Sequence, residues 1–209
     1  MIIRNETKED YREVEELTRK AFWNLHCQGC NEHYLVHIMR NHKDFIADLD
    51  FVLEIDGRIV ANIMYTKSKL VDEKGYEKEV LTFGPLSVLP EYQRKGYGKR
   101  IMEHSFKKCV ELGYDTIVIF GNPENYISTG FKSCKKYNVS FLGGVFPVAL
   151  LVKELLDGAL EYNKWSFHES SVYELDEIKA EEFDKDFELW KKEYKPSQEL
   201  FYIYSKSGL

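Results

Sequence analysis

A glycine-bearing turn with several cationic side chains is the feature with the clearest chemical potential. It runs from Gln93 to Gly98 as QRKGYG, and Lys99 and Arg100 follow directly. Glycine lets a backbone approach a ligand closely and adopt positive φ. The N–H groups that begin a helix are unpaired, and the helix dipole is positive there. A turn of this kind before a helix therefore predicts a phosphate site. An ordinary β–α turn with basic surface residues is the alternative.

The predicted elements on either side of this turn support a ligand site. Apolar residues recur at three-to-four spacing over residues 98–112 and then meet Gly113, which predicts an amphipathic helix that ends at a left-handed glycine. The strand before the turn contains Gly84-Pro85. Because proline cannot donate to a ladder, this pair predicts a bulged or splayed strand. An extended amide-bearing ligand could pair with it, and a plain kinked edge strand is the alternative.

Three short motifs in this region carry a family resemblance. They are Leu86-Ser87-Val88-Leu89-Pro90, Gln93-x-x-Gly96-x-Gly98, and a strand and short helix through Gly121–Tyr126 that lead to Gly130-Phe131. This segment, about a quarter of the chain, resembles the acetyl-coenzyme A-binding core of the GNAT N-acetyltransferase superfamily. The family's looser element order extends over residues 1–135. The resemblance implies a three-layer α/β fold, with a mixed central sheet, one splayed strand and helices on both faces.

The resemblance also implies a donor and the residues that bind it. Acetyl-coenzyme A would supply the acetyl group, with its diphosphate at the helix start and its pantetheine along the splayed strand. The residues expected to bind it are Leu86, Ser87, Val88, Gln93, Arg94, Lys95, Gly96, Tyr97, Gly98, Lys99, Asn122 and Tyr126. Asn122 and Pro123 also fit the N-cap and first residue of a helix, which requires no ligand.

Two of these residues have catalytic roles in this interpretation. The Val88 N–H is the predicted donor to the oxyanion that forms on the thioester carbon. Tyr126 is predicted to protonate the departing thiolate, as a tyrosine at this position often does in the family, and a phenol with a pKa of about 10 suits that role. The alternative is that Tyr126 only packs against pantetheine. The base that deprotonates the amine stays open among Glu32, His33, Glu79 and Glu124.

A second group of reactive side chains is His26-Cys27-x-x-Cys30-x-x-His33. A zinc site needs four converging ligands, and here all four would come from eight consecutive residues. We therefore expect no metal. Two interpretations remain: a solvated helix start with incidental cysteines, and an acceptor-binding role for Glu32 and His33.

The N-terminal part fits the element order of the resemblance. We expect a strand over residues 1–4, a helix capped at Thr7 with Asp10 in a capping box, and a second helix over residues 31–42. In the family these two helices wall the acceptor site. Residues 51–55 and 59–65 predict a hairpin that turns at Asp56-Gly57.

The C-terminal part carries a weaker signal. We expect residues 1–152 to form the acetyltransferase domain and residues 153–209 to form an appendage packed on it. Within this part, the pattern predicts strands over residues 137–141 and 145–152, a helix over 153–162, a strand at SSVYEL, and an acidic helix over 176–192 that ends before Lys195-Pro196.

Composition limits the classes of function. With 209 residues and a hydrophobic fraction of 44%, the chain is long and apolar enough to bury a core. A formal charge of −6 argues against nucleic acid as a partner. No apolar run approaches the roughly 20 residues of a membrane helix. The N-terminus lacks a signal-peptide core, so we expect a cytoplasmic enzyme with reduced cysteines.

The sequence thus predicts an N-acetyltransferase that acts on the primary amine of a small molecule, with a homodimer as a further option. A catalytically silent domain that binds acyl-coenzyme A is the first alternative. A nucleotide-binding protein is the second, although the chain has neither a Gly-Lys-Ser/Thr phosphate loop nor a Gly-x-Gly-x-x-Gly motif.

Overall fold

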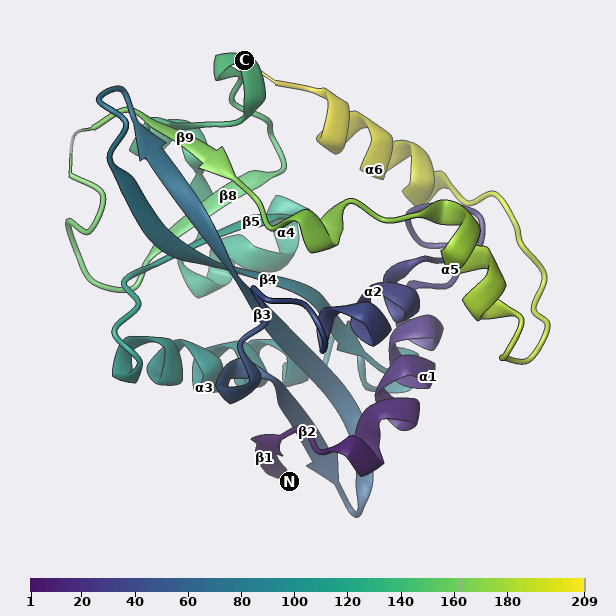
Figure 1. The fold of residues 1–209 in the computed structure, drawn as a ribbon. Coiled ribbons are helices and arrows are strands. Elements are labelled where there is room, and N and C mark those ends of the chain that lie inside the picture. The colour runs from purple at the N-terminus through teal and green to yellow at the C-terminus, as the bar shows by residue number, and fades with distance from the viewer. Residues whose placement is uncertain (162, 209) are drawn as a thin grey trace.

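The computed structural model describes residues 1–161 and 163–208, and within them a mixed sheet of nine strands forms the centre of the molecule (Figure 1). The strands are β1 (Ile2–Asn5), β2 (Phe51–Ile55), β3 (Arg58–Asp72), β4 (Glu77–Val88), β5 (Thr116–Phe120), β6 (Lys132–Ser133), β7 (Val139–Ser140), β8 (Leu150–Glu154) and β9 (Trp165–His168). The helices are α1 (Tyr11–Phe22), α2 (Glu32–Met39), α3 (Tyr97–Glu111), α4 (Pro123–Tyr126), α5 (Glu177–Asp184) and α6 (Pro196–Lys206). None of the described helices is long and apolar enough to cross a membrane.

The sheet has an antiparallel half and a crossover half. Its order is β1-β2-β3-β4-β5-β8-β6, and β9 pairs with both β3 and β7. The pairs from β1 to β4 are antiparallel, whereas β4 and β5 are parallel and are connected through α3. This arrangement confirms the expected α/β fold with a mixed central sheet.

Helices cover both faces of the sheet, as the buried polar contacts show. On one face, the Tyr65 hydroxyl of β3 lies 2.7 Å from Ser105 Oγ of α3. On the other face, Ser87 Oγ of β4 lies 2.9 Å from Thr18 Oγ1 of α1. Figure 1 shows α1 and α2 side by side on that second face, with the C-terminal segment crossing it toward them.

Local signals set the ends of the predicted helices. A short 3-10 turn precedes α1, and the Asp10 carboxylate accepts a hydrogen bond from the Thr7 N–H at 2.8 Å, as the capping box predicts. At the end of α3, the Tyr114 N–H donates to the Cys109 carbonyl and the Gly113 N–H donates to the Val110 carbonyl, each at 3.0 Å. These two bonds form a Schellman motif, in which Gly113 has a φ of 89°.

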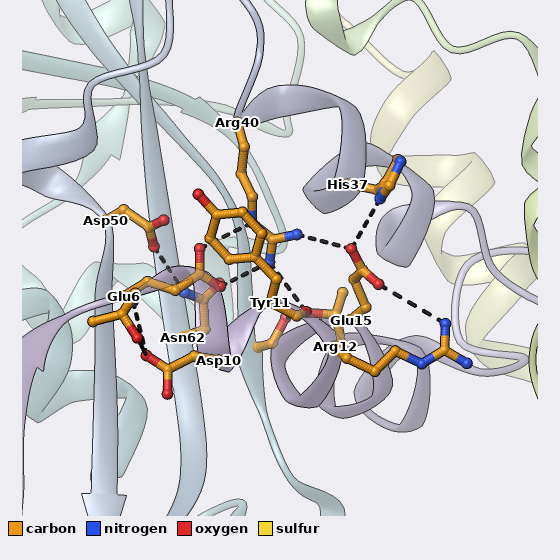
Figure 2. Close-up of polar contacts among 12 residues, drawn as sticks. Glu6, Asp10, Tyr11, Arg12, Glu15, His37, Arg40, Asp50 and Asn62 are labelled. Carbon is orange, nitrogen blue, oxygen red and sulfur yellow. Dashed lines mark hydrogen bonds and ion pairs between the residues drawn. The ribbon is translucent and has the colours of Figure 1, made fainter.

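A buried ion network fixes α1 and α2 to the N-terminal strands (Figure 2). The Arg40 guanidinium binds Glu6 at 2.7 Å and Glu15 at 2.8 Å, and its side chain is only 3% exposed. Nearby, Asp50 Oδ1 accepts a hydrogen bond from Asn62 Nδ2 at 3.0 Å. Burial, together with the neighbouring Glu6, raises the pKa of Asp50 well above its ordinary value. The network connects α1, through Glu15, with the end of α2 at Arg40 and with Glu6 after β1.

The C-terminal part differs from the sequence prediction in four elements. The helix expected over residues 153–162 is wrong: β8 extends to Glu154, turns occupy 155–161, and Tyr162 lies outside the described residues. The strand expected at SSVYEL is wrong, since Ser171–Tyr173 form a 3-10 turn, η7. The long acidic helix ends at Asp184, and the strand expected over 137–141 is only Val139–Ser140.

Pairing partners and caps explain these differences. The strand expected over residues 145–152 overlaps β8, and the last two residues of β8, Lys153 and Glu154, pair with Ile117 and Thr116 of β5. At these two residues, hydrogen bonding to a distant strand outweighs the local helix pattern. The Ser170 hydroxyl caps η7 and accepts from the Val172 N–H, which turns the chain away from an extended path. Pro196, expected to follow a helix, occupies the first turn of α6 instead, where its missing N–H costs nothing.

Candidate active site

The site is built where β4 and β5 diverge. The two parallel strands register at Leu81 and Ile117, near the start of both. Further along β4, Tyr65 pairs with Phe83 and Ile63 pairs with Leu86, so β4 holds one residue more than β3 between these pairs. This extra residue confirms the bulge that Gly84-Pro85 predicts.

Because strand residues alternate, every second residue of β4 directs its backbone N–H and C=O groups away from β3, toward the opening. The Leu89 N–H donates to the Val60 carbonyl at 2.9 Å, so the peptide of Ser87 also faces β3 and that of Val88 faces away. In agreement, the Val88 carbonyl accepts a hydrogen bond from Gln93 Nε2 at 3.0 Å. Leu86 and Val88 can therefore offer backbone groups to a ligand. Ser87 cannot, because its hydroxyl and its peptide both have internal partners.

The predicted anion site lies at the start of α3. The first intrahelical bond runs from the Arg100 N–H to the Gly96 carbonyl at 3.0 Å, so the three N–H groups of residues 97–99 precede it. Gly96 has a φ of 85°, a conformation that favours glycine. The positive φ expected at Gly98 is wrong, since Gly98 lies in the first helical turn. There, a Cβ would meet Val88 Cγ2 at 3.5 Å, an ordinary contact distance.

The charge around this helix start is positive. The side chains of Arg94, Lys95, Lys99 and Arg100 are all exposed. Lys95 Nζ donates to the Glu91 carbonyl at 2.7 Å, which leaves its charge without a carboxylate partner. Lys99 lies 3.7 Å from Glu103 on the helix surface. Together with the helix dipole, these cations suit a diphosphate.

Tyr126 lies at the end of α4, the short helix that follows β5. Asn122 caps this helix by accepting from the Glu124 N–H at 3.0 Å. The Tyr126 ring packs near Phe83 and Phe131, with centroids 5.8 and 5.9 Å away. Burial raises the pKa of the Tyr126 phenol to about 12, so the phenol is protonated at neutral pH. A Cβ at Gly121 would lie 2.5 Å from the Tyr126 ring, which explains the glycine there.

The structure places His33 away from any open surface. His33 is fully buried beneath Phe183 and Phe187 of the C-terminal segment, so it offers nothing to an acceptor. Its Nδ1 lies 3.3 Å from Cys30 Sγ and its Nε2 lies 3.1 Å from Asp184 Oδ1. Burial lowers the pKa of His33 to about 4. The interpretation as a solvated helix start is therefore wrong for Cys30 and His33.

Two of the other carboxylates named as bases are engaged in ion pairs. Glu32 accepts from the imidazole of His26 at 3.0 Å, and Glu79 lies 3.2 Å from Lys67. Glu124 is exposed on α4. Among the described residues, no group of three His, Cys, Asp or Glu side chains is placed to hold a metal ion.

Two residues of the C-terminal part, one of them in contact with the bulge, carry no signal in the sequence. The Tyr173 hydroxyl in η7 donates to the Gly84 carbonyl at 3.2 Å and lies 3.4 Å from Thr66 Oγ1. Glu169 precedes it, and burial, with the nearby charge of Glu174, raises the pKa of the Glu169 carboxyl to about 7. The pairing of β9 with β3 helps to hold this segment against the sheet, and no local sequence pattern indicates that pairing.

Comparisons with known proteins agree with this geometry. The Acetyltransferase (GNAT) family model matches residues 6–132. An Escherichia coli protein named uncharacterized N-acetyltransferase YhbS is 26% identical over 77% of this chain and 90% of its own. A second E. coli protein, the uncharacterized N-acetyltransferase YjhQ, is 24% identical over 61% of this chain and 67% of its own.

Solved structures show the same fold. The crystal structure of E. coli YhbS in complex with CoA has a TM-score of 0.70 and 21% identity, covering 83% of this chain and 92% of that one. A Brucella melitensis GNAT acetyltransferase in complex with acetyl-CoA has a TM-score of 0.64 and 21% identity, covering 82% and 97%. The family match spans more than half of the chain and includes the bulged strand, the glycine turn and the short helix that ends at Tyr126. The chain therefore belongs to the GNAT acetyltransferase family.

Proposed function

We propose that this acetyltransferase moves the acetyl group of acetyl-CoA to the primary amine of a small molecule by direct attack of the amine on the thioester. The observation that carries the proposal is the opening between β4 and β5, which faces the cationic start of α3. The structural relatives from E. coli and B. melitensis that hold CoA and acetyl-CoA support the same donor here.

The residues at this opening match the parts of such a donor. The free N–H groups of residues 97–99 and the exposed cations of the turn suit the diphosphate. The open peptide groups of Leu86 and Val88 suit the amides of pantetheine, which would pair with β4 as an added strand. Gln93 holds the Val88 carbonyl and so fixes the orientation of that peptide.

Acyl transfer requires a donor for the oxyanion and a partner for the leaving thiolate. We assign the first role to the Val88 N–H, because it points away from β3 into the opening. We assign the second to Tyr126, whose protonated phenol lies on the opposite side of the opening. The amine must also lose a proton before it attacks, which requires a base.

We further propose a small acceptor and a cytoplasmic location. The segment from β9 to η7 already covers the sheet face beside the bulge, where the Tyr173 hydroxyl reaches the Gly84 carbonyl. An extended polypeptide acceptor would have to displace that segment, whereas a small amine would not. The four cysteines are free, as is usual in a reducing compartment.

Thermal unfolding with acetyl-CoA, CoA, ATP and NAD tests the donor site. A ligand at about 100 times its dissociation constant should stabilise the fold by about 2.7 kcal/mol. We expect a shift in Tm with the two CoA species and none with ATP or NAD. Replacing both Arg94 and Lys95 by alanine should reduce the shift, and the same change at Lys135 and Lys136, remote from the turn, is the matched control.

Turnover is tested next, with a library of small amines and detection of free thiol. Release of CoA with one amine class supports the enzyme. Saturable binding of acetyl-CoA, without release of CoA in the presence of any amine of the library, would favour the silent acyl-CoA-binding domain. No Tm shift at saturating acetyl-CoA would contradict the proposal as a whole.

A further inference from the structure

We propose that Glu169 takes the proton from the acceptor amine, and that Tyr173 positions the strand bulge beside it. This inference rests on the proposed function and names the base that it requires. Glu169 lies outside the residues that match the family, so the assignment comes from this chain's own C-terminal segment.

Two contacts place this segment across the opening between β4 and β5. On one side, the Phe167 ring of β9 lies 6.3 Å from the ring of Phe120, the last residue of β5. On the other side, the Tyr173 hydroxyl donates to the Gly84 carbonyl in the β4 bulge at 3.2 Å. Glu169 lies between these two contacts along the chain. Figure 1 shows β9 and the residues after it crossing in front of the sheet.

The segment lies on the face of the sheet opposite α3. Tyr65 of β3 points to Ser105 of α3, so its neighbour Thr66 points to the other face, and Thr66 contacts Tyr173. The diphosphate site belongs to the α3 face, where Gly98 meets Val88. An acceptor that approaches past Glu169 would therefore reach the thioester from the face that the donor leaves open.

The charge around Glu169 suits an ammonium group. None of the ion pairs among the described residues involves this partly buried carboxylate, and Glu174 is the acid whose charge acts on it. Its carboxyl pKa of about 7 suits proton transfer near neutral pH. The Glu169 charge is also felt by Tyr173, whose phenol pKa is raised by burial and by that charge.

Other elements bring further charged groups to this segment. Asp44 accepts from the Ser170 hydroxyl at 2.8 Å, and the His42 imidazole lies 3.3 Å from the Ser171 hydroxyl. Lys69 of β3 pairs in register with His168. Asp44 has its own partner in Ser170. Of the two carboxylates in this segment, Glu174 is exposed and Glu169 is the partly buried one.

The proposed step balances as follows. One N–H bond of the ammonium breaks and its proton moves to the Glu169 carboxylate. The amine nitrogen then forms a bond with the thioester carbon, and the carbon–sulfur bond breaks. The second proton of the nitrogen ends on the leaving thiolate, and Glu169 returns its proton to water. The products are the amide, CoA and one proton.

The position of residue 169 relative to the acetyl carbon is tested with the variant Glu169→Cys and with bromoacetyl-CoA as the probe. If residue 169 faces the acetyl carbon, the introduced thiolate displaces bromide and forms a thioether with CoA, which mass spectrometry locates. We expect this reaction to be at least about tenfold faster than in Glu174→Cys, the matched control, and to be blocked by excess CoA. The unaltered protein reports the background from exposed Cys27.

Equal rates at residues 169 and 174, in a protein whose Tm rises with acetyl-CoA, would overturn the inference and leave the donor site standing. No Tm rise with acetyl-CoA would remove the proposed function first. Proton transfer is then tested by the pH profile of acetyl transfer to 2-phenylethylamine. Glu169→Gln should lose at least about tenfold in kcat/KM at pH 7 and recover toward high pH, where the free amine prevails. A pH profile that the substitution leaves unchanged would overturn the assignment of Glu169 as the base. If the unaltered protein does not acetylate 2-phenylethylamine, the comparison of alkylation rates at residues 169 and 174 decides whether the inference stands.

Discussion

Tyr126, the proposed partner of the leaving thiolate, has an apolar setting, and the setting and the proposed role have opposing consequences. Aromatic rings surround it and raise its phenol pKa to about 12. The phenol is therefore always available as a donor near neutral pH, but it is a weaker acid than a free tyrosine. A thiol has an ordinary pKa of about 8.5, so complete transfer of the phenol proton to a thiolate is uphill. Its contribution should come from a hydrogen bond to the sulfur as negative charge develops.

The first prediction follows from the weak acidity of the Tyr126 phenol. Tyr126→Phe should lower kcat by about 10- to 100-fold, at or below the low end of positioned general acids, because the phenol is a weak acid here. Acetyl-CoA affinity should change little, since the ring remains. Thiol release and equilibrium binding measure the two effects, with Tyr76→Phe on the surface as the control. An unchanged kcat would leave Tyr126 with a packing role only.

At the scale of elements, Gly98 is a position where the requirements of the fold and those of a ligand can be distinguished. It sits in the first turn of α3, where alanine is favoured over glycine by roughly 1 kcal/mol in a helix. A Cβ there would meet Val88 at 3.5 Å and Leu86 at 4.0 Å, which the protein tolerates. The fold therefore does not require this glycine, and a ligand backed against the helix start would explain it.

We predict that Gly98→Ala keeps or raises stability while it weakens acetyl-CoA binding. Urea unfolding and calorimetric titration measure the two quantities on the same sample. Gly96→Ala is the contrasting variant, because its φ of 85° should make alanine costly by about 1 kcal/mol or more. Unweakened binding in Gly98→Ala would show that the donor does not approach this turn closely.

The ion network around Arg40 predicts a second effect at this scale. Arg40→Ala removes the cation that bridges the buried carboxylates of Glu6 and Glu15 (Figure 2). Among the described ion pairs this leaves the Glu6 carboxylate without a cation, whereas Glu15 keeps Arg12 at 4.0 Å and His37 at 3.0 Å. Breaking a buried pair in this way costs about 3–5 kcal/mol. The urea midpoint should fall accordingly, and Lys164→Ala, which breaks an exposed pair with Glu73, should leave it nearly unchanged. Equal midpoints for the two variants would contradict the network's role.

The sequence predicts the elements that have local signals and fails where pairing is distant. Gly113 ends α3, Asn122 caps α4 and Pro85 marks the bulge, each through chemistry within a few neighbouring residues. In contrast, the last two residues of β8, which the sequence predicts to be helical, pair with the distant strand β5, and β9, which the sequence does not predict, pairs with β3. Local propensity predicts the conformation of a segment poorly where hydrogen bonding to a distant strand determines it.

The same rule divides the candidate site. The proposed donor side lies within one continuous segment, from Leu86 to Tyr126, and its residues could be named from the sequence. The proposed acceptor side involves Tyr173, whose hydroxyl reaches the Gly84 carbonyl 89 residues away in sequence. His33 shows the converse: a polar residue in a reactive motif is covered by Phe183 and Phe187, which no local pattern indicates.

At the scale of the whole molecule, the C-terminal segment closes over the two N-terminal helices. Arg19 of α1 binds Asp184 at 2.7 Å, and the side chains of Trp23 and Asn24 both donate to the Lys191 carbonyl. His33 is buried beneath this closure. The stability of the closure and the protonation of His33 are therefore linked.

The lowered pKa of His33 determines how the free energy of unfolding changes with pH, which is the last prediction. The pKa of His33 is about 4 in the folded protein, lowered by burial from an ordinary 6.5, while Asp184 opposes the shift and Arg19 adds to it. As pH falls below 6.5 the unfolded chain takes up this proton first, so the free energy of unfolding decreases between about pH 6.5 and 4. At 1.36 kcal/mol per tenfold change in proton affinity, the loss reaches up to about 3 kcal/mol.

His33→Gln should remove this contribution, so the difference in urea midpoint between the two proteins should shrink as pH falls from 7 to 4. His104→Gln, at an exposed site on α3, is the control and should leave the pH dependence as it is. Trp190 contacts Arg19 and Trp23, so its fluorescence would report whether the C-terminal segment separates from α1 in the same pH range. A constant difference in midpoint across this range would mean that His33 titrates normally and that the closure does not bury it in solution.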